Sequence, residues 1–308
     1  MVELNGIFTL LVSFASLAFA SELLAMGAEK LEDKLGQGIA GGIVLGLMTA
    51  LPETLIVIEA SVKGEYQVAL GSALGGNVIL FTLGIGLVGL THWSRWKENI
   101  KMTGDYQVEN KFLLLSTVIM IIIVIFEKLN FITSIITGGT YIAYFIYRLK
   151  QGYKDSIKNS KGLLIPSFEI GVGGIIIVIA SNYFVTSISC LSNSLRVPAI
   201  WLSLVITPIA AELEEKISAI RLTMRRKQGS SIALVSFMGS KIENSTLLLA
   251  IIGGFTSLSM LSSLPELLAA IIANFIGFSI LYDGKLGKLE SIILVLSYFA
   301  MIFITFIV

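Results

Sequence analysis

The sequence predicts an all-α polytopic membrane protein with about ten transmembrane helices, arranged as two inverted five-helix repeats. Its 308 residues are 55% hydrophobic and only 14% charged, whereas soluble domains carry roughly 25% charged residues. The apolar runs are each close to the ~20 residues that cross a bilayer as a helix. They are too continuous for the alternating strands of a membrane barrel. The chain also repeats itself: Lys128–Ile136 (KLNFITSII) returns as Lys285–Ile293 (KLGKLESII).

The apolar runs and the polar segments between them define the spans. We expect them, within a few residues at each end, at 7–27, 37–62, 67–91, 111–126, 130–148, 165–189, 197–222, 230–253, 261–281 and 287–307. The loops on one side of these spans then carry sixteen Lys and Arg residues, and the loops on the other side carry three. By the positive-inside rule, both termini lie outside and the two longest loops are cytoplasmic. We expect an integral protein of the plasma membrane.

An odd number of spans in each half inverts the second half relative to the first, as in many secondary transporters. We therefore divide the chain into a first repeat at 1–149, a cytoplasmic linker at 150–162 and an inverted second repeat at 163–308. Polar and small residues recur at a constant offset of 164 positions. The pairs are Ser72 and Ser236, Gly75 and Gly239, and Thr82 and Thr246.

Acidic residues interrupt an apolar span in each half. Glu53 lies within the second span, and Glu212, Glu214 and Glu215 lie within the seventh. The second span begins near Leu35 and the seventh near Val197. Glu53 and Glu215 each follow 18 residues later, so this spacing pairs Glu53 with Glu215. A charge in hydrocarbon costs roughly 2.5–3.5 kcal/mol. It is normally offset by a bound ion, an opposite charge or protonation.

Both halves also supply the neutral oxygen ligands that hard cations such as Ca²⁺ combine with carboxylates. Thr49 and Glu53 are four residues apart and share a helix face. Ser236, Ser240 and Glu243 share another face, and amide oxygens come from Asn77 and Asn244. Pro52 and Pro208 each remove a backbone donor, so we expect both acidic spans to be interrupted there.

Several other classes of protein lack support. The single His92 and single Cys190 leave no histidine metal cluster, no Ser-His-Asp triad and no internal disulfide. We expect no enzymatic activity and no cofactor. The net charge of +1 gives no reason to expect nucleic acid as a partner. The expected partners are inorganic cations and the lipid bilayer, and the sequence leaves the oligomeric state open.

Two acid-containing motifs resemble those of the Ca²⁺/cation antiporter superfamily, which includes Na⁺/Ca²⁺ and H⁺/Ca²⁺ exchangers. Its members have two inverted five-helix repeats, each with a motif similar to G-T-S-L-P-E followed by G-N-x-x-G-S/G. The first copy reads MTALPE at Met48–Glu53 and GSALGGN at Gly71–Asn77. The second reads TPIAAELEE at Thr207–Glu215 and VSFMGSKIEN at Val235–Asn244. The resemblance covers essentially the whole chain.

The resemblance implies a secondary active antiporter that exchanges Ca²⁺ for Na⁺ or H⁺ by alternating access, with the first and sixth spans sliding against the rest. It implies that Glu53 and Glu215 bind Ca²⁺. The remaining candidate ligands are Thr49, Ser72, Asn77, Glu212, Ser236, Ser240, Glu243 and Asn244.

Lys241 departs from the family pattern, because it stands beside Ser240, where members usually carry an uncharged residue. Its ammonium either occupies a cation position, pairs with Glu212 or Glu215, or extends to the membrane surface. An alternative function is therefore an atypical monovalent Na⁺/H⁺ antiporter of the same fold.

Overall fold

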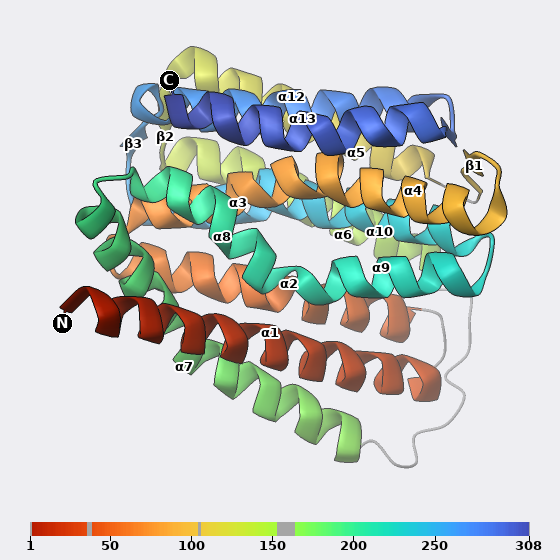
Figure 1. Ribbon diagram of the computed structural model, residues 1–308, viewed down its shortest axis with the longest axis horizontal. Helices are drawn as coiled ribbons and strands as arrows, with labels where there is room; N and C mark the ends of the chain where they lie inside the picture. Colours follow the sequence, from red (N-terminus) through yellow and green to blue (C-terminus); the bar gives the residue numbers. More distant parts are fainter. Residues whose placement is uncertain (1, 36–38, 104–105, 153–163, 308) are drawn as a thin grey trace.

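The computed structural model describes residues 2–35, 39–103, 106–152 and 164–307 (Figure 1). The elements of the first half are α1 (Val2–Leu35), α2 (Ile39–Val62), α3 (Tyr66–Ile79), the π-helix η1 (Leu80–Gly84), α4 (Ile85–Trp96), β1 (Ile100–Lys101), α5 (Gln107–Phe126), β2 (Lys128–Leu129) and α6 (Phe131–Gly152). Those of the second half are α7 (Leu164–Leu195), α8 (Ala199–Ala211), α9 (Leu213–Arg225), α10 (Gly229–Glu243), the π-helix η2 (Asn244–Leu248), α11 (Leu249–Phe255), β3 (Leu258–Ser259), the 3₁₀ helix η3 (Leu261–Ser263), α12 (Leu264–Tyr282), β4 (Lys285–Leu286) and α13 (Lys288–Ile307).

The predicted fold class is confirmed. Within the described residues, α3-η1-α4, α8-α9 and α10-η2-α11 each form one segment, so each half has five helical segments that run along the molecule (Figure 1). Six segments in the described part of the chain are long and apolar enough to cross a membrane by length and composition alone. The other segments include α2, α8-α9 and α10-η2-α11, which carry the buried acids Glu53, Glu212 and Glu243. Most of the predicted linker lies outside the described residues.

Two short antiparallel ribbons join the halves and reveal the inverted relation between them. Ile100 pairs with Leu286 in the β1-β4 ribbon, and Leu129 pairs with Leu258 in the β2-β3 ribbon. β1 and β3 occupy equivalent places in the two halves, and so do β2 and β4. The β1-β4 ribbon in one orientation therefore corresponds to the β2-β3 ribbon when the halves are exchanged. The ribbons lie at opposite ends of the molecule, and both chain termini lie at the end with β2 and β3 (Figure 1).

The 164-residue repeat also appears as a local backbone feature. η1 and η2 begin at Leu80 and Asn244, and each contains one of the paired threonines. The hydroxyl of Thr82 donates to the carbonyl of Val78, and the hydroxyl of Thr246 donates to the carbonyl of Ile242. A hydroxyl that competes for the carbonyl four residues earlier disturbs the α-helical ladder. Single π-turns are frequent at functional sites.

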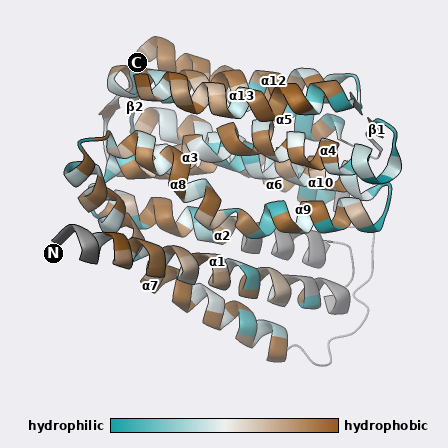
Figure 2. Cartoon of the chain, viewed as in Figure 1, coloured by the Kyte–Doolittle hydropathy of each residue, from teal (hydrophilic) through white to brown (hydrophobic). Residues whose placement is uncertain are grey.

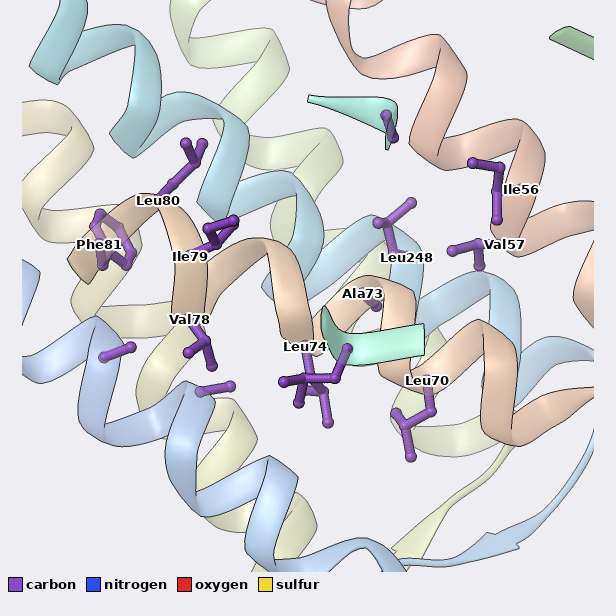
Figure 3. Packing of buried hydrophobic residues seen from close by; sticks show 14 of the residues in the cluster. Ile56, Val57, Leu70, Ala73, Leu74, Val78, Ile79, Leu80, Phe81 and Leu248 are labelled. Carbon is purple, nitrogen blue, oxygen red and sulfur yellow. The ribbon is translucent and has the colours of Figure 1, made fainter. Parts of the chain in front are cut away.

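The centre of the molecule is the contact between α3 and α8, which belong to different halves. α3 is buried from Val68 to Ile79, and Figure 3 shows its apolar side chains within the core. A β-carbon on Gly71 would lie 2.2 Å from the carbonyl oxygen of Ile200, and one on Gly75 would lie 2.2 Å from that of Leu204. Only glycine allows the two helices to approach this closely.

The outer helices present apolar side chains outward. Phe8 is 68% exposed, Ile125 is 69% exposed and Phe303 is 64% exposed. Figure 2 shows hydrophobic residues along α12 and α13 and hydrophilic residues around β1. Because a lipid bilayer offers no hydrogen bonds, such surfaces suit hydrocarbon and the polar groups stay inside or at the ends. α1 and α7 pack against each other along one side of the bundle (Figure 1).

The expected helix breaks are only half correct. α2 runs from Ile39 to Val62 with Pro52 inside it, so the interruption expected there is wrong. The segment with Pro208 does break: α8 ends at Ala211, and Glu212 has φ −112° and ψ 13°. The Pro208 carbonyl accepts from the Glu212 amide at 3.2 Å and from Lys216 Nζ at 3.0 Å. In the second half, a lysine ammonium therefore stabilises the carbonyl end of the broken helix.

Candidate cation site

A buried ion-pair cluster lies where the two halves meet. Glu53 comes from α2, Glu212 from the break between α8 and α9, and Lys241 from α10. The Lys241 side chain is fully buried, and its Nζ contacts Glu212 Oε1 and lies 4.0 Å from Glu53 Oε2. The carboxyl groups of Glu53 and Glu212 also act on each other electrostatically. One ammonium thus holds together two carboxylates from opposite halves of the chain.

Glu212 is held from both sides because it lies at the helix break. Its Oε2 accepts from Lys216 Nζ at 3.1 Å, while its Oε1 accepts from Lys241. Lys216 also caps the carbonyl end of α8, so the break and the carboxylate share one ammonium. A buried carboxylate needs such partners, because removing it from water without them is costly.

Besides its ion pair with Lys241, Glu53 accepts a hydrogen bond from a neutral donor. Asn244, the first residue of η2, donates from Nδ2 to Glu53 Oε1 at 3.1 Å. The backbone of α3 passes directly beside the cluster at Gly76. A β-carbon there would lie 2.1 Å from Asn244 Nδ2, 2.6 Å from Glu212 Oε1 and 2.7 Å from Lys241 Nζ. The repeat equivalent of Gly76 is Ser240, which does carry a side chain. The close approach of the cluster to the backbone therefore requires glycine at this repeat position in the first half but not in the second.

Glu243 forms a second buried carboxylate centre, bound by neutral donors. Thr54 Oγ1 donates to Glu243 Oε1 at 3.0 Å, and the Tyr141 hydroxyl donates to Oε2 at 3.2 Å. Thr54 follows Glu53 in α2, and Glu243 precedes Asn244 at the end of α10. The two centres are therefore connected through adjacent residues on both helices.

Asn77 belongs to a neighbouring polar cluster. Its Nδ2 donates to Ser245 Oγ at 2.5 Å and to Asn274 Oδ1 at 2.7 Å. Asn274 in turn donates to Thr117 Oγ1 at 3.2 Å. The buried Oδ1 of Asn77 has no hydrogen-bond partner among the described residues. These contacts join α3, α5, η2 and α12 around the amide group of Asn77.

The acid that meets Glu53 is Glu212, whereas the sequence spacing favoured Glu215. The spacing argument assumed a continuous helix, and the break at Glu212 changes the direction of every side chain after it. Glu215 lies in the first turn of α9, is partly buried and interacts electrostatically with Lys241, Glu212 and Lys216. It lies close to the cluster without sharing the contact between Lys241 and Glu53.

The side chains of the remaining predicted ligands differ in how deeply they are buried. Ser72 is buried in α3, and its hydroxyl has no hydrogen-bond partner in the described part of the chain. Its repeat equivalent, Ser236, is exposed on α10, and Ser240 is partly buried. Thr49 lies in α2, but its side chain falls outside the described residues. Within the residues described, no three His, Cys, Asp or Glu side chains form a metal-binding group by themselves.

Several residues at the site were not found from the sequence. Thr54 and Tyr141 sit in ordinary helical sequence, and nothing local distinguishes them from packing residues. Lys216 carried a detectable signal, because it is a charged residue inside the expected span 197–222. Asn274 carried a detectable signal, because it is an amide in the middle of the apolar run 261–281. Polar residues in such positions face the protein interior.

Comparisons with known proteins agree with this architecture. The sequence model of the family described as "Sodium/calcium exchanger protein" matches residues 5–150 and 168–307. "Inner membrane protein YrbG" of Escherichia coli (strain K12) is 23% identical over 227 residues, covering 69% of this chain and 68% of that protein. "Sodium/calcium exchanger NCL2" of Oryza sativa subsp. japonica is 34% identical over 82 residues, and the match spans only 14% of that relative.

Solved structures share the fold. The H⁺/Ca²⁺ exchanger CAX superposes with a TM-score of 0.80 at 18% identity, covering 98% of this chain and 86% of that chain. The sodium-calcium exchanger NCX_Mj, in a crystal soaked with Na⁺, gives a TM-score of 0.68 at 18% identity, covering 98% and 99%. The family match extends over both halves and includes every residue of the buried cluster. The chain therefore belongs to the sodium/calcium exchanger family.

Proposed function

We propose that this protein is a secondary active antiporter that exchanges Ca²⁺ for Na⁺ or H⁺ by alternating access. The observation that carries the proposal is the buried pairing of Glu53 and Glu212, from opposite inverted halves, with the same ammonium group of Lys241. A site between inverted repeats opens to one side or the other when the repeats move relative to each other. The loop charges favour a plasma-membrane protein with both termini outside.

Glu53 and Glu212 would supply carboxylate oxygens to the ion. Ser72 and Asn77 would add neutral oxygens, because their buried side-chain oxygens have no hydrogen-bond partner in the described part of the chain. Glu215, Glu243 and Asn244 would act at its edge, and Thr49, Ser236 and Ser240 stay candidate ligands. A carboxylate-rich set of oxygens suits Ca²⁺ and also binds the exchanged ion in turn. α1 and α7, which pack along one side of the bundle, are the elements we propose to slide.

An alternative is a monovalent Na⁺/H⁺ antiporter of the same fold. The buried contact of Lys241 with Glu212 favours it, because one positive charge already balances part of the acidic cluster. A site with less negative charge attracts a divalent cation less strongly.

The test is radioactive Ca²⁺ uptake into proteoliposomes, with Na⁺ and pH gradients imposed separately. We expect a gradient-driven uptake that Glu53→Gln abolishes. The matched control is Glu59→Gln, which changes an acid on the same helix that pairs instead with Lys63 at 3.4 Å. Equal uptake by Glu53→Gln and the wild type would exclude the proposed site. Absence of Ca²⁺ uptake together with Na⁺/H⁺ exchange would establish the alternative.

A further inference from the structure

We propose that Lys241 is an internal cation of this antiporter: its ammonium occupies the position between Glu53 and Glu212, and the transported ion must displace it. This inference rests on the proposed function and deepens it. It makes Lys241 a specificity-determining residue, because the charge that it contributes sets how strongly a divalent ion is favoured over a monovalent one.

The geometry places the ammonium where an ion would bind. Lys241 Nζ contacts Glu212 Oε1 and lies 4.0 Å from Glu53 Oε2, and it is the only cationic group of the described residues paired with Glu53. The backbone of Gly76 closes the other side, since an added β-carbon would lie 2.7 Å from Nζ. An ion that used both carboxylates would need the volume that the ammonium fills.

The formal charges explain why displacement is required. The groups in direct ion pairs are two carboxylates, Glu53 and Glu212, and two ammonium groups, Lys241 and Lys216. These four charges sum to zero when all are ionised, whereas Glu215 acts on them at longer range. A cation that enters such a neutral group gains little attraction unless one ammonium moves away. Lys216 also binds the carbonyl of Pro208 at 3.0 Å and thereby holds the helix end. Lys241 has no comparable backbone bond among the described residues and is the group that can leave.

A carboxylate is available to the displaced ammonium. Glu215, one turn after Glu212 in α9, interacts electrostatically with Lys241 and is only partly buried. Moving Nζ from Glu212 towards Glu215 keeps a buried charge paired. This gives the acid that the sequence paired with Glu53 a distinct role as the alternative partner of the lysine.

The charge of the bound ion determines how much it gains when the ammonium is removed. Coulombic energy is proportional to the ion's charge. The same change in local potential therefore raises the logarithm of the Ca²⁺ affinity twice as much as that of the Na⁺ affinity. In Lys241→Met, which keeps the length of the side chain, we expect Ca²⁺ affinity to rise at least tenfold, or about 1.4 kcal/mol. Na⁺ affinity is expected to rise by roughly the square root of the change for Ca²⁺.

The experiment is equilibrium binding of radioactive Ca²⁺ and Na⁺ to the purified full-length protein in detergent. The variants are Lys241→Met and Lys241→Arg, and the control is Lys227→Met, which removes a surface lysine that pairs with Glu98. We expect tighter binding in Lys241→Met alone. If Lys241 only stabilised the site, its removal would weaken Ca²⁺ binding. Equal or weaker Ca²⁺ binding in a folded Lys241→Met protein therefore overturns the inference.

A second comparison applies if Lys241→Met does not fold. Glu212→Gln leaves Lys241 paired with Glu53 alone, and the double variant Glu212→Gln/Lys241→Met removes both charges of the closest pair. If the Lys241 ammonium competes with the transported ion, the double variant binds Na⁺ more tightly than Glu212→Gln does. Weaker Na⁺ binding by the double variant overturns the inference. Exchange by the wild type without these changes in affinity rejects the inference and leaves the proposed function standing. No binding or exchange in any variant rejects both.

Discussion

The two halves of this protein share a backbone design but place different side chains on it. Each has a π-turn at the same repeat position, at Leu80–Gly84 and at Asn244–Leu248. Before the π-turn, the first half has Gly76 and Asn77 where the second has Ser240 and Lys241. At the next positions, the first half has Ile79 and Leu80 where the second has Glu243 and Asn244.

The two halves therefore contribute different properties to the site: the first half provides space for the cluster, and the second half provides most of its polar groups. The first half contributes a closely packed helix, α3, whose glycines let α8 and the ion-pair cluster approach its backbone. The second half contributes most of the polar groups: Glu212, Lys241, Glu243 and Asn244. Glu53 is the main charge from the first half. The two halves therefore share one backbone framework, whereas most of the polar groups of the site lie between Glu212 and Asn244 in the second half.

The largest expected effect comes from filling the space at Gly76. A methyl group there collides with the ends of the Asn244, Glu212 and Lys241 side chains. Because these ends are flexible, we expect Gly76→Ala to fold but to misplace the cluster, lowering exchange about a hundredfold, since displacements of ~1 Å carry costs of that size. Gly254→Ala is the control, because nothing lies within 4 Å of its added β-carbon. Equal initial rates in proteoliposomes would remove Gly76 from the site.

The packing asymmetry predicts unequal stability effects at a pair of equivalent glycines. Gly75→Ala places a β-carbon 2.2 Å from the backbone oxygen of Leu204, whereas Gly239→Ala approaches only the Tyr144 hydroxyl at 3.1 Å. Overpacking against backbone costs about 1–3 kcal/mol or more. We expect a clearly lower melting temperature in detergent for Gly75→Ala and a small change for Gly239→Ala. Similar changes would contradict the view that only the first half relies on close packing here.

The acids of the second half offer a direct test of their assignment. Glu212 contacts Lys241, which also pairs with Glu53, whereas Glu215 interacts with the cluster at longer range. We expect Glu212→Gln to lower the exchange rate roughly tenfold more than Glu215→Gln does, corresponding to about 1.4 kcal/mol. Initial rates at saturating ion on both sides provide the measurement. The reverse order would restore the pairing that the sequence spacing favoured.

The smallest expected effects concern the donors to Glu243, which both come from the first half. Thr54→Val and Tyr141→Phe each remove one hydrogen bond to this carboxylate. A typical hydrogen bond within a protein contributes about 0.5–1.5 kcal/mol net. We expect a change in ion affinity of several-fold for each variant, with the double variant departing from additivity because both act on one group. Additive effects would indicate that Glu243 does not couple them.

The sequence could predict the fold because its signal is repeated over long segments. Apolar runs, loop charges and the 164-residue offset all agree, and the offset pairs Thr82 with Thr246, which the structure places in the two π-turns. It could not predict which acid meets Glu53. That choice depends on whether a helix stays straight after a proline, and α2 continues past Pro52 while the second-half helix breaks after Pro208.

By itself, then, the sequence determined a membrane protein of two inverted repeats with acids and neutral oxygens in its interior. These properties follow from hydrophobicity, periodicity and charge, which act residue by residue. Only the tertiary structure decided that Lys241 lies between Glu53 and Glu212, that Glu243 is bound by Thr54 and Tyr141, and that Gly76 makes room for the cluster. Such contacts join residues far apart in the chain, and their geometry depends on how helices from opposite halves pack.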